Sequence, residues 1–414
     1  MTATLPPETE RSRDGASAAA STRAAPLSPA GSHRPIEHGA RERLLSLDVF
    51  RGVTVAAMLL VNNPGSWGAI YPPLEHAEWN GWTPTDLIFP FFLFIVGITT
   101  HLSMEARRAR GDDDGALVRQ VLRRGALIVL LGLLMSAYPF YPLDRITTMR
   151  FPGVLQRIGV AYTFAALLTL RTSLKTQLLI VVALLYGYWF AMTLVPVPGR
   201  GIGALLLDDP SASLAAWIDR AVFGVHLWKS SRTWDPEGLF STVPAIASVI
   251  LGVFAGRWLA TPRPIESRLV ALFGVGAICM VAGLMWGWSF PINKSLWTSS
   301  YVLFAAGTGG VALATCIWVI DVSGVRWWTT PFLWYGMNPM VAFVGSGMMA
   351  RTIYSLVTVP RNGERVPIQR VIYEDYYLTW LEPRDASLLF AVTFVIVWAG
   401  VLGTLYRKRI FFKV

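Results

Sequence analysis

The chain has 414 residues, of which 53% are hydrophobic and only 15% are charged, and it contains 17 tryptophans. A soluble protein of this length could not bury so much apolar surface, so the composition excludes a soluble globular protein and predicts an all-α polytopic membrane protein. The net charge of +10 does not indicate a nucleic-acid partner, because the Lys and Arg residues fall in particular connections between apolar runs.

Apolar runs of about 20 residues, each long enough to cross a hydrocarbon layer of roughly 30 Å, recur along the chain. We interpret them as about ten transmembrane helices in a single membrane domain that covers residues 41–414. In chain order the predicted spans are 45–63, 85–104, 121–140, 153–171, 176–195, 240–259, 268–290, 299–321, 328–349 and 385–406.

The loop charges predict an orientation. Arginines crowd the second connection between residues 107 and 124, whereas the first connection, 62–84, has neither Lys nor Arg. By the positive-inside rule the basic connections are cytoplasmic. Both termini are then cytoplasmic, the first connection faces the periplasm, and the protein is expected in the cytoplasmic (inner) membrane. The ninth connection, 351–384, is basic yet falls outside in this topology.

The first 40 residues and the cysteines carry little chemistry. Residues 1–40 are rich in Ala, Ser, Pro, Arg and Thr and lack an apolar stretch, which predicts a disordered cytoplasmic tail and not a signal peptide. Cys279 and Cys316 both fall inside predicted spans. We therefore expect no disulfide framework and, without a Cys/His cluster at ligand spacing, no metal site.

The first span carries polar residues at both ends. Asp48 and Arg51 lie three residues apart near its cytoplasmic end. They form either a structural ion pair or part of a site for a cofactor phosphate. Asn62 lies at the outer end, just before Pro64-Gly65, where a turn alone would explain it.

The first outer connection holds His76 between acidic neighbours. A histidine in a loop is usually a surface residue, but Glu75 and Glu78 are close enough to raise or orient the imidazole, and Trp79 supplies an aromatic wall. Asp86 completes a capping-box pattern after Thr83-Pro84-Thr85, which predicts a structural role at the helix start.

Polar and aromatic clusters also precede the fourth, sixth and eighth spans. Such mixtures bind sugars by stacking and hydrogen bonding, although any one of them alone fits an ordinary interfacial cap. The substrate-binding candidates are Glu75, Trp79, Asp86, Gln156, Arg157, Trp234, Glu237, Asn293, Lys294 and Trp297.

Several ordered segments closely resemble the heparan-α-glucosaminide N-acetyltransferase family, which belongs to a broader group of transmembrane acyltransferases. The resemblance runs from about Arg43 to the C-terminus and is carried by RLLSLDVFRG, VNNPG, HAEWNGWTPTDLIFPFFLFIVG, GVLQRI, WDPEGLFST and FPINKSLWTSS. It implies a membrane enzyme that takes an acetyl group from cytoplasmic acetyl-CoA and delivers it to a glucosamine amine across the membrane. By motif, the active-site histidine falls on His76 and an active-site asparagine on Asn62.

The resemblance suggests a role for each candidate. A neutral imidazole at His76 suits either a general base or an acyl-imidazole carrier, and both routes stay open. Asn62 is a candidate donor to the thioester oxygen. The candidates for holding CoA are Arg51, Asp48 and Arg124, with Arg107, Arg108 and Arg123 nearby.

Two other functions stay open. One is a permease for N-acetylglucosamine or a related sugar, which the lack of a clear inverted repeat weakens. The other is a degenerate family member that only scaffolds a partner. The expected partners are an amino sugar or oligosaccharide acceptor and the lipid bilayer, with no nucleic acid; a homodimer is left open.

Overall fold

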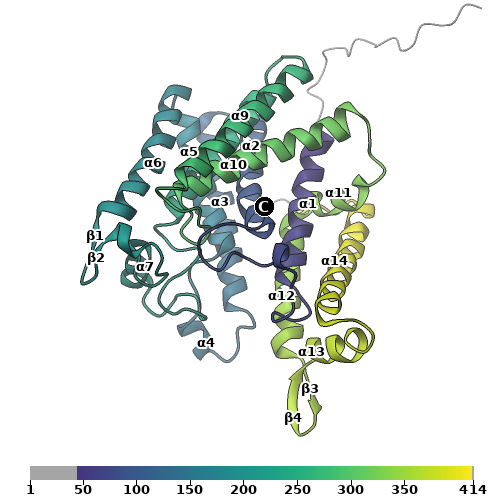
Figure 1. Cartoon of the computed structure of the whole chain (residues 1–414). Helices are drawn as coiled ribbons and strands as arrows, with labels where there is room; N and C mark the ends of the chain where they lie inside the picture. The colour runs from purple at the N-terminus through teal and green to yellow at the C-terminus, as the bar shows by residue number, and fades with distance from the viewer. Residues whose placement is uncertain (1–43, 413–414) are drawn as a thin grey trace, which may run out of the picture. The chain divides into compact units, whose positions relative to one another are not determined.

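The computed structural model describes residues 44–412, and helices dominate them (Figure 1). Each predicted span coincides with a helix or a helix pair, so the expectation of an all-α multi-pass membrane protein is confirmed. The helices at these positions are α1 (Leu45–Asn62), α2 (Ile88–Arg108), α3 (Asp114–Ala137), α5 (Val154–Arg171), α6 (Leu174–Leu194), α8 (Thr242–Leu259), α9 (Ile265–Trp286), α10 (Ser299–Ile317), α11 (Thr329–Met337), α12 (Pro339–Arg351) and α14 (Pro383–Arg407).

Within residues 44–412, seven helices are long and apolar enough to cross a membrane. The helices α3 and α5 are not among them; both carry arginines, such as Arg124 and Arg157. The ninth predicted span is interrupted at Asn338, because Pro339 begins a new helix there and proline cannot continue a helical hydrogen-bond ladder. The number of ten spans therefore stays a prediction.

The helix α1 links two groups of helices. It packs against α2 and α10 on one side and against α11, α12 and α14 on the other (Figure 1). Its crossing with α11 is close because both helices present glycine. A Cβ atom on Gly52 would lie 1.8 Å from the Phe332 carbonyl oxygen, and one on Gly336 would lie 2.0 Å from that of Asp48. Small residues allow such backbone approach between membrane helices.

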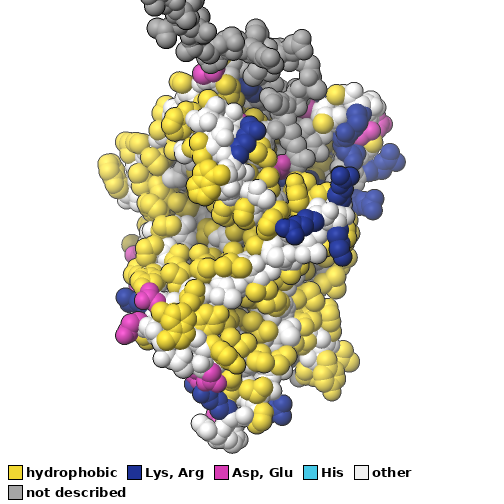
Figure 2. Space-filling view, turned by 90° about the vertical axis from the view of Figure 1, so that its right-hand side faces the viewer, with side chains coloured by type: hydrophobic (Ala, Val, Ile, Leu, Met, Phe, Trp, Pro, Cys, Tyr) yellow, Lys and Arg dark blue, Asp and Glu magenta, His cyan; other side chains and the backbone are white. Residues whose placement is uncertain are grey.

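The core of the larger group lies where α2, α5, α8 and α10 meet. Leu93, Ile158, Val249 and Tyr301 from these four helices are buried in one apolar cluster. On the outside the pattern reverses: hydrophobic side chains cover most of the face in Figure 2, and α14 exposes Ile396 among others. An apolar exterior around an apolar core is what a lipid environment requires.

Short elements also lie between the long helices or at their ends. They include the β3–β4 hairpin, whose Asn362-Gly363 turn has positive φ at both residues, the strongest short-range hairpin signal. These elements are α4 (Asp144–Thr147), α7 (Leu214–Phe223), α13 (Ile368–Ile372), the 3-10 turns η1 (Pro72–Leu74), η2 (Pro84–Leu87) and η3 (Gly203–Leu206), the π-helical turns η4 (Trp318–Val322), η5 (Thr352–Leu356) and η6 (Tyr373–Tyr377), and the strands β1 (Pro196–Val197), β2 (Gly201–Ile202), β3 (Thr358–Arg361) and β4 (Glu364–Pro367). The tail predicted over 1–40 lies outside the described residues.

Candidate active site

His76 is held by Asp86. The His76 Nδ1 atom lies 2.7 Å from Asp86 Oδ1, and the other carboxylate oxygen accepts the backbone N–H groups of Ala77 and Thr83, each at 3.0 Å. These donors favour the ionised carboxylate. An ionised carboxylate only accepts hydrogen bonds, so Nδ1 carries a proton, and in the neutral imidazole Nε2 keeps its lone pair. With a side chain 45% exposed, His76 presents Nε2 as a base.

The local sequence explains why Asp86 is in place. Thr83 begins η2 and Pro84 occupies its first turn, and both bonds of the capping box are present, as predicted. The carboxylate therefore anchors the helix start and the imidazole together. On the opposite side, Tyr301 from α10 donates its hydroxyl proton to the Asp86 carbonyl oxygen at 2.5 Å. Asp86 is thus structural and a positioning residue for His76.

Lys294 lies beside both His76 and Asp86. Its Nζ atom lies 3.1 Å from Nδ1 and 3.2 Å from Nε2 of His76, and 3.7 Å from Asp86 Oδ1. Burial lowers the pKa of Lys294 below its ordinary value, and the carboxylates of Asp86 and Glu237 offset only part of that effect. The lysine precedes α10 in a turn in which the Asn293 carboxamide oxygen accepts the Leu296 N–H at 2.9 Å.

Three connections between helices meet around His76, Asp86 and Lys294. Trp79 packs edge to face against Trp234 at 5.1 Å. The Asn80 carboxamide links the other two connections, donating to Asp208 at 2.6 Å and accepting from Asn293 at 3.1 Å. The structure thus brings together clusters that lie far apart in the sequence, and they form an aromatic and amide rim beside His76.

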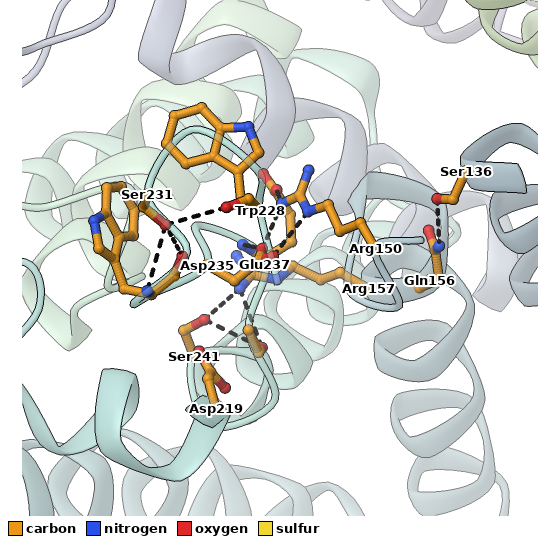
Figure 3. A network of polar contacts seen from close by, with 12 residues as sticks. Ser136, Arg150, Gln156, Arg157, Asp219, Trp228, Ser231, Asp235, Glu237 and Ser241 are labelled. Carbon is orange, nitrogen blue, oxygen red and sulfur yellow. Dashed lines mark hydrogen bonds and ion pairs between the residues drawn. The ribbon is translucent and has the colours of Figure 1, made fainter. Parts of the chain in front are cut away.

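A network of ion pairs joins Arg150 to two carboxylates that follow Trp234 in the chain (Figure 3). Arg150 donates through Nε to Asp235 at 2.8 Å and through Nη2 to Asp235 and Glu237. Burial alone would lower the pKa of Arg150, but these carboxylates raise it above its ordinary value. Burial likewise opposes ionisation of Glu237, yet Arg150, Arg157 and Lys294 lower its pKa. The network therefore stays charged and couples electrostatically to Lys294.

Arg157 has unused hydrogen-bond donors. It is 1% exposed, its Nη2 atom donates to Ser241 and Gly238, and its guanidinium lies 4.9 Å from the centre of the Trp297 ring. Within residues 44–412 neither Nε nor Nη1 has a partner. Buried donors are rarely left unpaired, so they are available to a ligand oxygen or to water. Trp297 is fully buried and supports Arg157 rather than lining the rim.

Asp219 on α7 predicts a pH dependence of stability. Burial raises its pKa to about 7, although the Leu239 N–H group, bonded at 2.8 Å, favours the ionised form. Unfolded chains ionise near the ordinary value of about 4, so stability falls as the pH rises from about 4 to about 7. We expect Asp219→Asn to raise the melting temperature at pH 8 and to change it much less at pH 5. Equal shifts at both pH values in thermal unfolding assays would contradict this assignment.

Other predicted residues lie on the helices α1 and α3. Asn62 is exposed at the end of α1, and no hydrogen bond joins it to His76 within residues 44–412. Arg51 bonds Asp48 at 2.6 Å and the Gly336 carbonyl at 2.8 Å, which matches the structural ion pair. Arg124 lies over the Tyr162 ring at 5.1 Å, and its buried Nε atom has no partner in the described part of the chain.

Sequence reasoning assigned the orientation of His76 to the wrong acids. Glu75 and Glu78 are exposed, and in the described chain no hydrogen bond joins either carboxylate to the imidazole; Asp86 makes that contact. Arg150 and its buried partner Asp235 were not among the predicted residues. Asp235 lies between two predicted residues, Trp234 and Glu237, and this position in the sequence could have indicated it. Gln156 is buried, with Nε2 3.5 Å from the Ser136 hydroxyl.

Comparison with known proteins shows the family of the chain. Residues 43–285, more than half of the chain, match the model of a family described as heparan-alpha-glucosaminide N-acetyltransferase, catalytic. The chain belongs to this family. Its matched region contains His76, Asp86, Arg157 and Glu237, whereas Lys294 lies beyond it.

Two mammalian relatives extend the match. The chain is 29% identical to the heparan-alpha-glucosaminide N-acetyltransferase of Homo sapiens, over 90% of this chain and 60% of the relative. It is also 29% identical to that of Mus musculus, over 95% of this chain and 64% of the relative. The chain thus spans less than two thirds of the length of either relative.

Proposed function

We propose that this family member is an acetyltransferase that moves an acetyl group from cytoplasmic acetyl-CoA to an amino sugar at the periplasmic face of the inner membrane. The observation that carries the proposal is the His76–Asp86 pair, in which Nδ1 faces the carboxylate and leaves Nε2 to accept a proton. The names of the relatives supply the acceptor class, an amino sugar.

The chemistry follows from the pair. The acceptor amine must lose a proton as it attacks the thioester carbonyl, and Nε2 of His76 receives that proton. Asp86 holds the imidazole in the required tautomer and stabilises the imidazolium that forms. Transfer through an acetylated His76 uses the same nitrogen, so both routes fit.

The donor would be held by residues away from His76. Arg124 fits a CoA phosphate better than Arg51, because its buried Nε atom is unpaired whereas Arg51 bonds Asp48 and Gly336.

The thioester oxygen develops negative charge during transfer and needs a hydrogen-bond donor nearby. Arg157 offers two buried donor nitrogens, Nε and Nη1, and Asn62 remains the candidate from the family motif.

The decisive experiment uses purified protein in detergent with labelled acetyl-CoA and a panel of amino sugars. Acetylated sugar is the expected product. Sugar flux into liposomes without acetyl-CoA, together with no acetylated product, would favour a permease.

A topology measurement tests the direction of transfer. We expect a cysteine at Gly68, an exposed loop position, to react with an impermeant reagent in intact cells, because its connection lacks Lys and Arg. A cysteine at Gly115 in the basic connection should react only after permeabilisation. The reverse pattern would place His76 in the cytoplasm.

A further inference from the structure

Lys294 occupies the place that the proposed reaction reserves for the acceptor. Its Nζ atom lies over the imidazole, 3.2 Å from His76 Nε2 and 3.1 Å from Nδ1, and both distances are shorter than its 3.7 Å approach to Asp86 Oδ1. An amine within about 3.2 Å of the base is what general-base catalysis requires of a nucleophile. In the absence of a sugar, the amine next to the base is therefore the enzyme's own.

We propose that Lys294 is a self-acetylation site, to which the enzyme transfers the acetyl group when a donor is bound and no acceptor is present. This inference rests on the proposed function, since it uses the same donor and the same base. Lys294 and the acceptor amine then compete for the same acetyl group.

The step balances. The Nζ lone pair attacks the thioester carbonyl carbon, and a C–N bond forms as the C–S bond breaks. Of the two protons that the ammonium group loses, one ends on the sulfur of CoA and the other leaves through His76 Nε2 to solvent. Burial lowers the pKa of Lys294, which increases the neutral, nucleophilic fraction of the amine.

Acetylation should stop further turnover. The amide product is neutral, so the ion pair of Lys294 with Asp86 and its electrostatic attraction to Glu237 are lost, and the added acetyl group fills the space beside Nε2. A bound acceptor would displace the lysine from the base and protect it.

The test incubates full-length protein with labelled acetyl-CoA alone and maps the label by mass spectrometry. The chain has few lysines to resolve: Lys175, Lys229, Lys294, Lys408 and Lys413. We expect label on Lys294 at least about tenfold above exposed Lys229, which reports uncatalysed acetylation, as a base within reach provides at least this factor. An amino-sugar acceptor and His76→Gln should each reduce the label.

Activity after preincubation provides a second readout. The wild type should lose transfer activity with time in acetyl-CoA alone, whereas Lys294→Arg, which keeps the charge but lacks this amine, should retain its own starting rate. Sugar acetylation with unmodified Lys294, or equal label on Lys229, would overturn this inference alone. If neither sugar nor protein is acetylated, the proposed function itself fails.

Discussion

Replacing His76 with glutamine should lower the rate of acetyl transfer by at least about 10²-fold, and by up to about 10⁴-fold, the range for loss of general acid–base catalysis. Glutamine retains a polar side chain of similar size but offers no nitrogen lone pair to accept the proton. Because the His76 side chain is 45% exposed, the melting temperature should stay nearly unchanged. The measurement is single-turnover transfer from labelled acetyl-CoA to an amino sugar.

The matched control for this result is Glu78→Gln, which removes an exposed charge from the same loop. It should transfer at close to the wild-type rate. If His76→Gln transferred acetyl as fast as Glu78→Gln, the imidazole would be neither base nor acetyl carrier. If an acetyl group can be trapped on His76 after rapid quenching, the two-step route applies.

Asp86→Asn should also reduce transfer strongly, by about 10²-fold to 10⁴-fold, because an asparagine amide facing Nδ1 favours the wrong tautomer of the imidazole. The asparagine oxygen can still accept the N–H groups of Ala77 and Thr83, so most of the helix cap survives. The expected signature is a large loss of rate with a small loss of stability. It is measured by the same transfer assay and by thermal unfolding.

Thr83→Ala separates the two roles of this carboxylate. It removes the hydroxyl that bonds Asp86 Oδ2 and the Glu75 carbonyl, and it should destabilise the protein by about 1 kcal/mol, as for a lost cap. The His76 contact remains, so the rate of the folded fraction should change little.

If the Asp86→Asn enzyme transferred acetyl at the normal rate, Asp86 would act only as a helix cap. The capping-box pattern alone predicts such a purely structural role for Asp86. The hydrogen bond to His76 instead predicts that the substitution lowers the rate.

Several features of this site were predictable because they depend on neighbours in the sequence. The capping box joins residues three apart, and the flanking residues alone indicate it. The hydrogen-bond partner of His76 was harder to predict, because Glu75 and Glu78 are nearer to it in the sequence than Asp86. Asp86 lies ten residues after His76 in the sequence, and the connection between them folds back so that its carboxylate reaches His76 Nδ1. Proximity in the sequence does not predict this contact.

The sequence by itself determined that this is a multi-pass helical membrane protein of an acetyltransferase family, because apolar length, loop charge and ordered motifs are properties of short segments. Only the tertiary structure decided that Lys294 meets His76 across 218 residues and that Arg150 joins Glu237 across 87. Such pairs form because helix packing places loop ends side by side and because charges removed from water require partners. No single segment specifies which partner that is.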